Sequence, residues 1–223
     1  MPPTAVLYVF TLGVAAGLTL VIMGAYGRLS PRWLQVLLLA SGALLAARYI
    51  GLTFLFVAPH EIPTQLLGIV WRSAPISFLL SSAVAVDQLL RHPAMTPKKL
   101  VRWMSPFLFA FALISLLAPT VLAGDPRVGW ALCLPSLWGV ALVAVQGVVA
   151  VVILGLGIFL ARKIPSKPII EALLLIGMAQ AMWTCAIAGT GLRCTTAPPA
   201  PLTGDLLLLV ALWYAFDRAD PAH

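Results

Sequence analysis

Charged side chains are scarce in this sequence. Only 9% of its 223 residues are Asp, Glu, Lys or Arg, asparagine does not occur, and 61% of the residues are hydrophobic. A soluble domain carries about 25% charged and about 45–50% apolar residues. A soluble fold of this size could not hide so much apolar surface, because a sizeable part of any small domain stays exposed. The composition therefore excludes a soluble protein and indicates that its solvent is lipid.

Carboxylates and histidines are missing from the middle of the long apolar runs. The three histidines, His60, His92 and His223, lie at the edges of these runs or beyond them. This excludes paired intramembrane histidines for haem and a core zinc site, and the lack of central carboxylates argues against a buried proton relay or cation site. Walker, nucleophile-elbow and dinucleotide motifs are also missing. We therefore expect no metal, no cofactor and no enzymatic activity.

Seven apolar stretches are long enough, or nearly long enough, to cross a bilayer. A spanning helix needs about 20 apolar residues, and the predicted helices lie near 4–26, 33–57, 64–87, 100–123, 136–161, 168–189 and 202–216. The last is the shortest, since its helix extends only roughly 22 Å, and a re-entrant segment is the alternative. The predicted fold is all-α: a polytopic transmembrane bundle of seven helices in a single domain, residues 1–223.

Lysine and arginine mark the loops that we expect on the cytoplasmic side. The loops after the first, third and fifth predicted helices hold nine of these residues, whereas the alternate loops hold two, Arg127 and Arg193. Short cytoplasmic loops carry such an excess. The sequence thus predicts an outside N-terminus, a cytoplasmic C-terminus and a bacterial-type inner (plasma) membrane. The net charge of +7 follows from this topology, and without a basic helix or stacking aromatics we expect no nucleic-acid partner.

Two arginines interrupt the apolar runs. Arg48 lies in the second predicted helix and Arg72 in the third. These helices run in opposite directions, and both arginines fall at nearly the same depth in the outer half of the bilayer. An arginine at the membrane centre costs about 2.5–3.5 kcal/mol on insertion scales and usually faces the bundle interior or a wet cavity. Because a guanidinium stays protonated, we expect each arginine to face something negative.

The arginines predict an outward-facing pocket for an anion. Its candidate lining residues are Arg48, Arg72, Tyr49, Trp71, Glu61, His60, Gln180 and Trp183. A guanidinium fork suits carboxylate or phosphate, so the expected ligand is an anionic or amphipathic small molecule or a lipid, and the expected role is that of a transporter or sensor component. Two alternatives stay open. The arginines pair with Glu61, Asp205 and exposed carbonyls and only lock helices together, or they meet an acidic partner in a larger membrane complex or homo-oligomer.

The predicted helices contain a proline that would interrupt one of them and small residues that recur every four positions. Pro75 follows Arg72 by less than one turn and predicts a kink, either a packing kink or a hinge, because proline removes a helical hydrogen bond. Small residues recur every four positions at Ser73, Ser77 and Ser81, and Gly42 precedes Ala46 at the same spacing. Such spacing lets helices approach closely. We interpret the serines as a packing seam, with a polar conduction path as the alternative.

Cysteine is scarce as well. Of the three cysteines, Cys133 and Cys194 fall in predicted outer loops, whereas Cys185 lies within the sixth predicted helix. If the outside is a periplasm or cell exterior, a disulfide between Cys133 and Cys194 is permitted, and free thiols are the alternative. Cys185 is most simply a small apolar packing residue.

Overall fold

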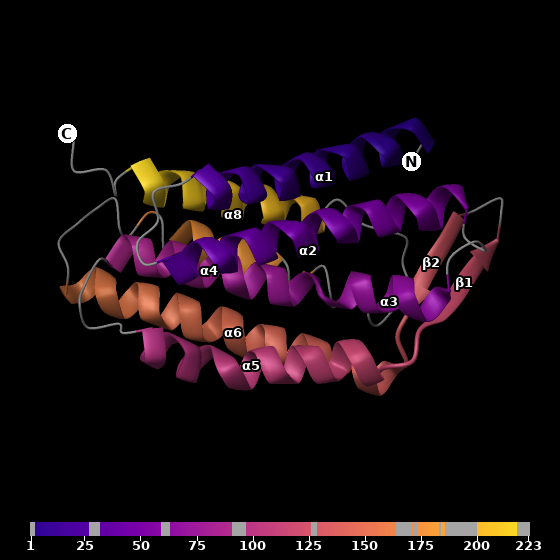
Figure 1. The fold of residues 1–223 in the computed structure, drawn as a ribbon. Helices are drawn as coiled ribbons and strands as arrows, with labels where there is room; N and C mark the ends of the chain where they lie inside the picture. The colour runs from indigo at the N-terminus through magenta and orange to yellow at the C-terminus, as the bar shows by residue number, and fades with distance from the viewer. Residues whose placement is uncertain are drawn as a thin grey trace.

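The structure is a computed structural model of residues 1–223. It describes the whole chain except residues 1–2, 27–31, 59–62, 91–96, 126–128, 164–170, 172–173, 183, 186–199 and 218–223. The helices are α1 (Pro3–Tyr26), α2 (Arg32–Val57), α3 (Thr64–Arg72), α4 (Ala74–Leu90), α5 (Pro97–Leu117), α6 (Ser136–Lys163) and α8 (Ala200–Asp217). Residues 174–182 and 184–185 are helical as well. The long helices lie side by side along one axis, with a small β-hairpin at one end (Figure 1).

Four helical stretches in the described part of the chain are long and apolar enough to cross a membrane. They are Val6–Tyr26, Arg32–Leu55, Thr64–Val84 and Leu137–Gly155. Two shorter apolar helices cover Arg102–Leu117 and Leu202–Trp213. Large apolar side chains also remain exposed on the outside of the bundle, among them Phe109 and Val151, each 70% exposed. The chain is therefore a helical membrane protein, as its composition predicts.

The predicted fourth span ends earlier than expected. α5 stops at Leu117, and the chain then forms an antiparallel hairpin of β1 (Val121–Asp125) and β2 (Gly129–Cys133), in which Val121 pairs with Cys133. Pro119 explains the early end, because the residue before a proline is disfavoured in the helical conformation. The prediction that this helix continues to residue 123 was wrong, since the apolar residues after Pro119 belong to a strand. The described part of the chain is otherwise mostly helical, as predicted.

The predicted third helix is divided at Ser73 into α3 and α4. Pro75 has no backbone N–H to offer the preceding turn, and the N–H of Ile76 donates to the Ser73 carbonyl at 3.0 Å rather than continuing the helix of α3. The carbonyl of Arg72 is thereby freed, and the Ser115 hydroxyl of α5 donates to it at 3.0 Å. The chain has the predicted interruption, and α5 supplies the hydrogen bond that the interruption removes.

Glycines bring α1 and α2 into backbone contact. A Cβ added at Gly17 would lie 2.5 Å from the backbone nitrogen of Ala46, and one at Gly42 would lie 2.6 Å from the carbonyl oxygen of Gly17. Gly13, one turn before Gly17, leaves room for the ring of Tyr49. Gly13 and Gly17 form a GxxxG pair, which is typical of close helix packing in membranes. The sequence interpretation above noted only the α2 side of this seam.

Candidate functional site

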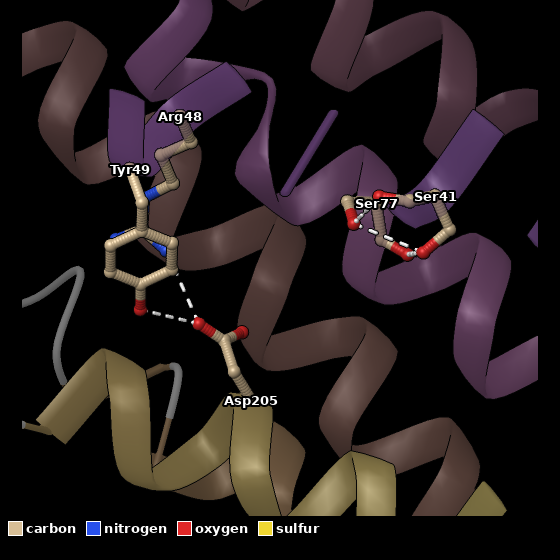
Figure 2. Close-up of polar contacts among 5 residues, drawn as sticks. All are labelled: Ser41, Arg48, Tyr49, Ser77 and Asp205. Atoms are coloured by element: carbon tan, nitrogen blue, oxygen red, sulfur yellow. Dashed lines mark hydrogen bonds and ion pairs between the residues drawn. The ribbon is translucent and has the colours of Figure 1, made fainter. Parts of the chain in front are cut away.

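Arg48 is neutralised by a carboxylate on another helix. α2 buries Arg48, which is only 4% exposed, and its Nη1 lies 3.7 Å from Oδ2 of Asp205 on α8. The Tyr49 hydroxyl donates to the same carboxylate oxygen at 2.6 Å. Figure 2 shows the three side chains converging between α2 and α8. Sequence reasoning named Asp205 only as a structural partner for the arginines, and that is the contact that the structure contains.

Arg72 has a different environment. The residue is 1% exposed, and its Nε and Nη2 donate to the Ser115 carbonyl at 3.2 and 2.8 Å. Its Nη1 donates to the Thr120 hydroxyl. A guanidinium has five N–H donors, so these bonds use three of them. Within the described residues Arg72 forms no ion pair, and both of its partners are electrically neutral.

One face of α3 holds Arg72 in place. Gln65, Gly68 and Arg72 are three and four residues apart, a spacing that puts side chains on the same side of a helix. The Gln65 amide donates to the Ala118 carbonyl at 3.2 Å and accepts from the Thr120 backbone N–H at 3.1 Å. Gly68 provides the space that the Thr120 side chain fills. α3 is thus fixed to the segment that joins α5 to β1.

The two arginines occupy one layer of the bundle. Ser41 of α2 and Ser77 of α4 exchange hydrogen bonds with each other's carbonyls at 2.8 and 2.6 Å, and a Cβ added at Gly51 would lie 3.5 Å from Val70. These contacts show that α2 runs antiparallel to α3 and α4. Arg48 is seven residues from Ser41, and Arg72 is five from Ser77 on the same side. At a rise of about 1.5 Å per residue, Arg48 lies roughly 10 Å from Ser41 along its helix. Arg72 lies roughly 8 Å from Ser77 in the same direction, so the two arginines are at nearly the same level.

Two of the other predicted pocket residues, Trp71 and Gln180, lie in the described part of the chain, and neither contacts Arg48 or Arg72 through a hydrogen bond there. Trp71 is partly buried and packs against the apolar core. Gln180 is fully buried but bonds to Gln146 of α6 and Ser82 of α4, and Ser82 is ten residues, roughly 15 Å along a helix, from Arg72. The remaining predicted pocket residues, His60, Glu61 and Trp183, lie outside the described residues.

A shallow apolar depression opens on the exposed face of α2. It is lined by Ile50, Thr53, Phe54 and Val57 and encloses about 230 Å³. At about 100° of rotation per residue these positions face away from Arg48. The depression lacks a charged group, so it adds no anion-binding chemistry to the arginine layer.

Two of the three cysteines lie in the described part of the chain, and one is disulfide-bonded while the other is a free thiol. Cys133, at the end of β2, is buried and disulfide-bonded. Its predicted partner, Cys194, lies outside the described residues, so that pairing stays a prediction. Cys185 is a free thiol on an exposed position, where it faces the surroundings of the bundle rather than its core.

Ser115, Thr120 and Gln65 are the site residues that sequence reasoning missed. They were not predicted because the sequence predicts a helix around Thr120, although the spacing of residues 65, 68 and 72 on one face of a helix can be read from the sequence.

The described residues contain no group of three or more His, Cys, Asp or Glu that could hold a metal ion. No family model matches this chain, and no curated protein or solved structure matches it.

Proposed function

We propose that this protein is a non-catalytic, multi-pass membrane protein that binds an anionic or amphipathic small molecule, or a lipid headgroup, in the outer half of its bundle. Arg72 is the proposed anion-binding group, and the role is that of a transporter or sensor component. The observation that supports it is the contrast between two arginines in one layer. Arg48 has Asp205 beside it, whereas among the described residues Arg72 has a carbonyl and a hydroxyl as its partners and no carboxylate.

Neutral partners leave the charge of Arg72 uncompensated. Hydrogen bonds from a carbonyl and a hydroxyl replace lost water contacts, but they do not cancel a net charge in a medium of low dielectric constant, where an unpaired ion is costly. An anion beside the guanidinium would cancel it. The two N–H groups that remain match the two oxygens that a carboxylate or phosphate presents to an arginine.

Access to Arg72 requires a movement of α3. The side chain is 1% exposed, so a ligand reaches it only when the surrounding groups shift. α3 is a nine-residue helix separated from α4 at Ser73, and such interruptions are where helices bend. The Thr120 hydroxyl is neutral, so a ligand oxygen would replace it as the partner of Nη1 with a gain in electrostatic energy.

The proposed orientation places this layer near the outside. Lysine and arginine concentrate in the loops predicted to be cytoplasmic, which supports an outside N-terminus and a cytoplasmic C-terminus. The bonded state of Cys133 fits an oxidising compartment next to the hairpin. Both observations support the proposed bacterial-type inner (plasma) membrane, with the arginine layer in its outer leaflet.

Thermal unfolding in lipid nanodiscs tests the proposal. Nanodiscs of phosphatidylcholine are compared with nanodiscs that also contain phosphatidylglycerol, and with the first kind plus inorganic phosphate or citrate. A ligand at a hundred times its Kd stabilises the folded state by about 2.7 kcal/mol, and each kcal/mol raises the Tm of a protein of this size by about 2–4 °C. We expect one anion class to raise the Tm by about 5–10 °C.

Arginine variants assign the effect. Arg72→Gln should abolish the anion-dependent rise, Arg72→Lys should weaken it because the fork is lost, and Arg102→Gln, which removes an exposed arginine of α5, should retain it. A rise with phosphatidylglycerol alone identifies a lipid headgroup, and a rise with phosphate or citrate identifies a free anion. If no anion raises the Tm and Arg72→Gln instead releases an acidic membrane partner or a second copy of the chain, the protein is an assembly subunit.

A further inference from the structure

A chain of buried amides ends in an unsatisfied group inside the bundle. Gln146 of α6 is 1% exposed, and its Nε2 donates to Oε1 of Gln180. The Gln180 Nε2 then donates to the Ser82 hydroxyl of α4 at 2.9 Å. The Oε1 of Gln146 is buried and has no hydrogen-bond partner within the described residues. Three helical segments are therefore linked by a polar chain whose end needs one more partner.

The unsatisfied group does not depend on how the amides are oriented. If both amides are turned over, Ser82 donates to Gln180, Gln180 donates to Gln146, and the Nε2 of Gln146 is left over instead. Leaving such a group unpaired costs about 1–3 kcal/mol. Nearly all buried polar groups in native proteins have a protein or water partner. Gln146 consequently calls for a small partner that either donates or accepts.

The described residues pack loosely beside Gln146, at Gly147. Among the described residues, a Cβ added at the neighbouring Gly147 would meet one atom within 4 Å, the Cγ2 of Thr184 at 4.0 Å. By contrast, a Cβ at Gly177, on the opposing helical segment, would lie 3.0 Å from the Cγ of Leu154 and in still closer contact with its Cδ2. α6 thus packs tightly at Leu154 and loosely around Gly147.

We propose that a water molecule is bound at the Gln146 amide, between α6 and the helical segment that carries Gln180. Water both donates and accepts hydrogen bonds, so it satisfies either orientation of the amide. The three hydrogen-bonded residues, Gln146, Gln180 and Ser82, carry no charge, which disfavours a bound ion at this position. Ser82 follows Ser81, whose hydroxyl bonds to Ser41 of α2, so the water would complete a polar layer that crosses four helical segments. The site is independent of the anion site at Arg72.

Solid-state NMR on wild-type protein in nanodiscs tests this site. Magnetisation is transferred from water to nitrogen-15-labelled glutamine side chains and to backbone amides, and Gln146→Met assigns the Gln146 side-chain signal by its loss. We expect transfer to the Gln146 amide to be several-fold faster than transfer to the backbone amide of Val149, a 3% exposed residue one turn further along α6. Equal, slow build-up at both positions would overturn the proposal.

A density map of the wild-type protein gives a second, direct readout. The expected result is a compact peak at about 2.7–3.2 Å from the Gln146 amide, with a further polar group in hydrogen-bond reach. A space closed by side chains, or an elongated density typical of a lipid chain, would contradict a bound water even if the NMR variant fails to fold.

Discussion

Gly17→Leu is expected to separate α1 from α2 and to destabilise the bundle. The atoms that a Cβ at this position would strike belong to the backbone of Ala46, at 2.5 Å for its nitrogen and 2.9 Å for its Cα. A flexible side chain could move aside, but a helix backbone moves only if the helix moves. Overpacking a well-packed interior typically costs about 1–3 kcal/mol and occasionally more, so we expect a loss at or above the upper value.

The effect should reach the Arg48 cluster. Tyr49 packs its ring against Gly13, one turn from Gly17, and donates to Asp205. If α1 moves away, the Tyr49 ring therefore loses its packing contact with Gly13. Thermal unfolding in nanodiscs measures the change, with an expected fall in Tm of about 6–12 °C at about 2–4 °C per kcal/mol.

Gly155→Leu is the matched control for this prediction. Gly155 is an exposed helical glycine of α6, and a Cβ added there meets no atom of the described residues within 4 Å. The same glycine-to-leucine change should therefore alter stability by no more than about 0.5 kcal/mol, as surface substitutions usually do. Equal unfolding temperatures for the two variants would show that the α1–α2 contact does not hold the bundle together.

The helix positions were predictable because membrane thickness dictates them. Apolar runs of spanning length mark α1, α2 and α6 within a few residues of their observed bounds, and Pro75 marks the break between α3 and α4. β1 escaped prediction because Val121 and Leu122 are as apolar as the helix before them. The signal that was available is Pro119, which ends a helix wherever the preceding residue is forced out of the α conformation.

The shared layer of Arg48 and Arg72 was predictable, and Asp205 was among the predicted partners, but which partner each arginine takes was not predictable. Helical rise and antiparallel neighbours place Arg48 and Arg72 at the same level of the bundle, so the layer follows from counting residues. Partners depend on how each helix is rotated and on which helices are neighbours, and these are set by packing across the whole bundle. The Tyr49–Asp205 bond joins residues 156 positions apart, and no local pattern in the sequence specifies such a contact.

Asp205→Leu is expected to cost about 3–5 kcal/mol of folding stability, the usual consequence of removing one partner from a buried ion pair. Asp205 is 2% exposed and Arg48 is 4% exposed, so the charge left on Arg48 cannot reach bulk water. Arg48→Met removes the guanidinium that lies beside the carboxylate and should cost a similar amount. Asp205→Asn should be milder than Asp205→Leu, because the amide oxygen still accepts from Tyr49.

The combined variant Arg48→Met/Tyr49→Phe/Asp205→Leu should recover most of that loss. Replacing a complete buried ionic cluster by apolar side chains of similar volume is often neutral or stabilising. Arg32→Met, at an exposed position at the start of α2, is the control for the arginine-to-methionine change and should stay within about 0.5 kcal/mol of wild type. A combined variant no more stable than the worst single one would show that the cluster does more than balance charge.

Arg72→Met should behave differently from Arg48→Met, and this difference connects stability to the proposed function. Removing Arg72 leaves the Ser115 carbonyl and the Thr120 hydroxyl without their donor, which costs about 1–3 kcal/mol for each unsatisfied group. Unlike the removal of Arg48, it does not separate a carboxylate from its cation. In phosphatidylcholine nanodiscs without added anions the variant also loses an uncompensated cation, which offsets part of that cost. We therefore expect a smaller fall in Tm than for Arg48→Met. The difference should narrow or reverse when the anion that binds wild type is added, because Arg48→Met keeps the anion-binding arginine and Arg72→Met does not. If Arg72→Met is the more harmful change without any anion, the guanidinium is a structural clamp between α3 and α5.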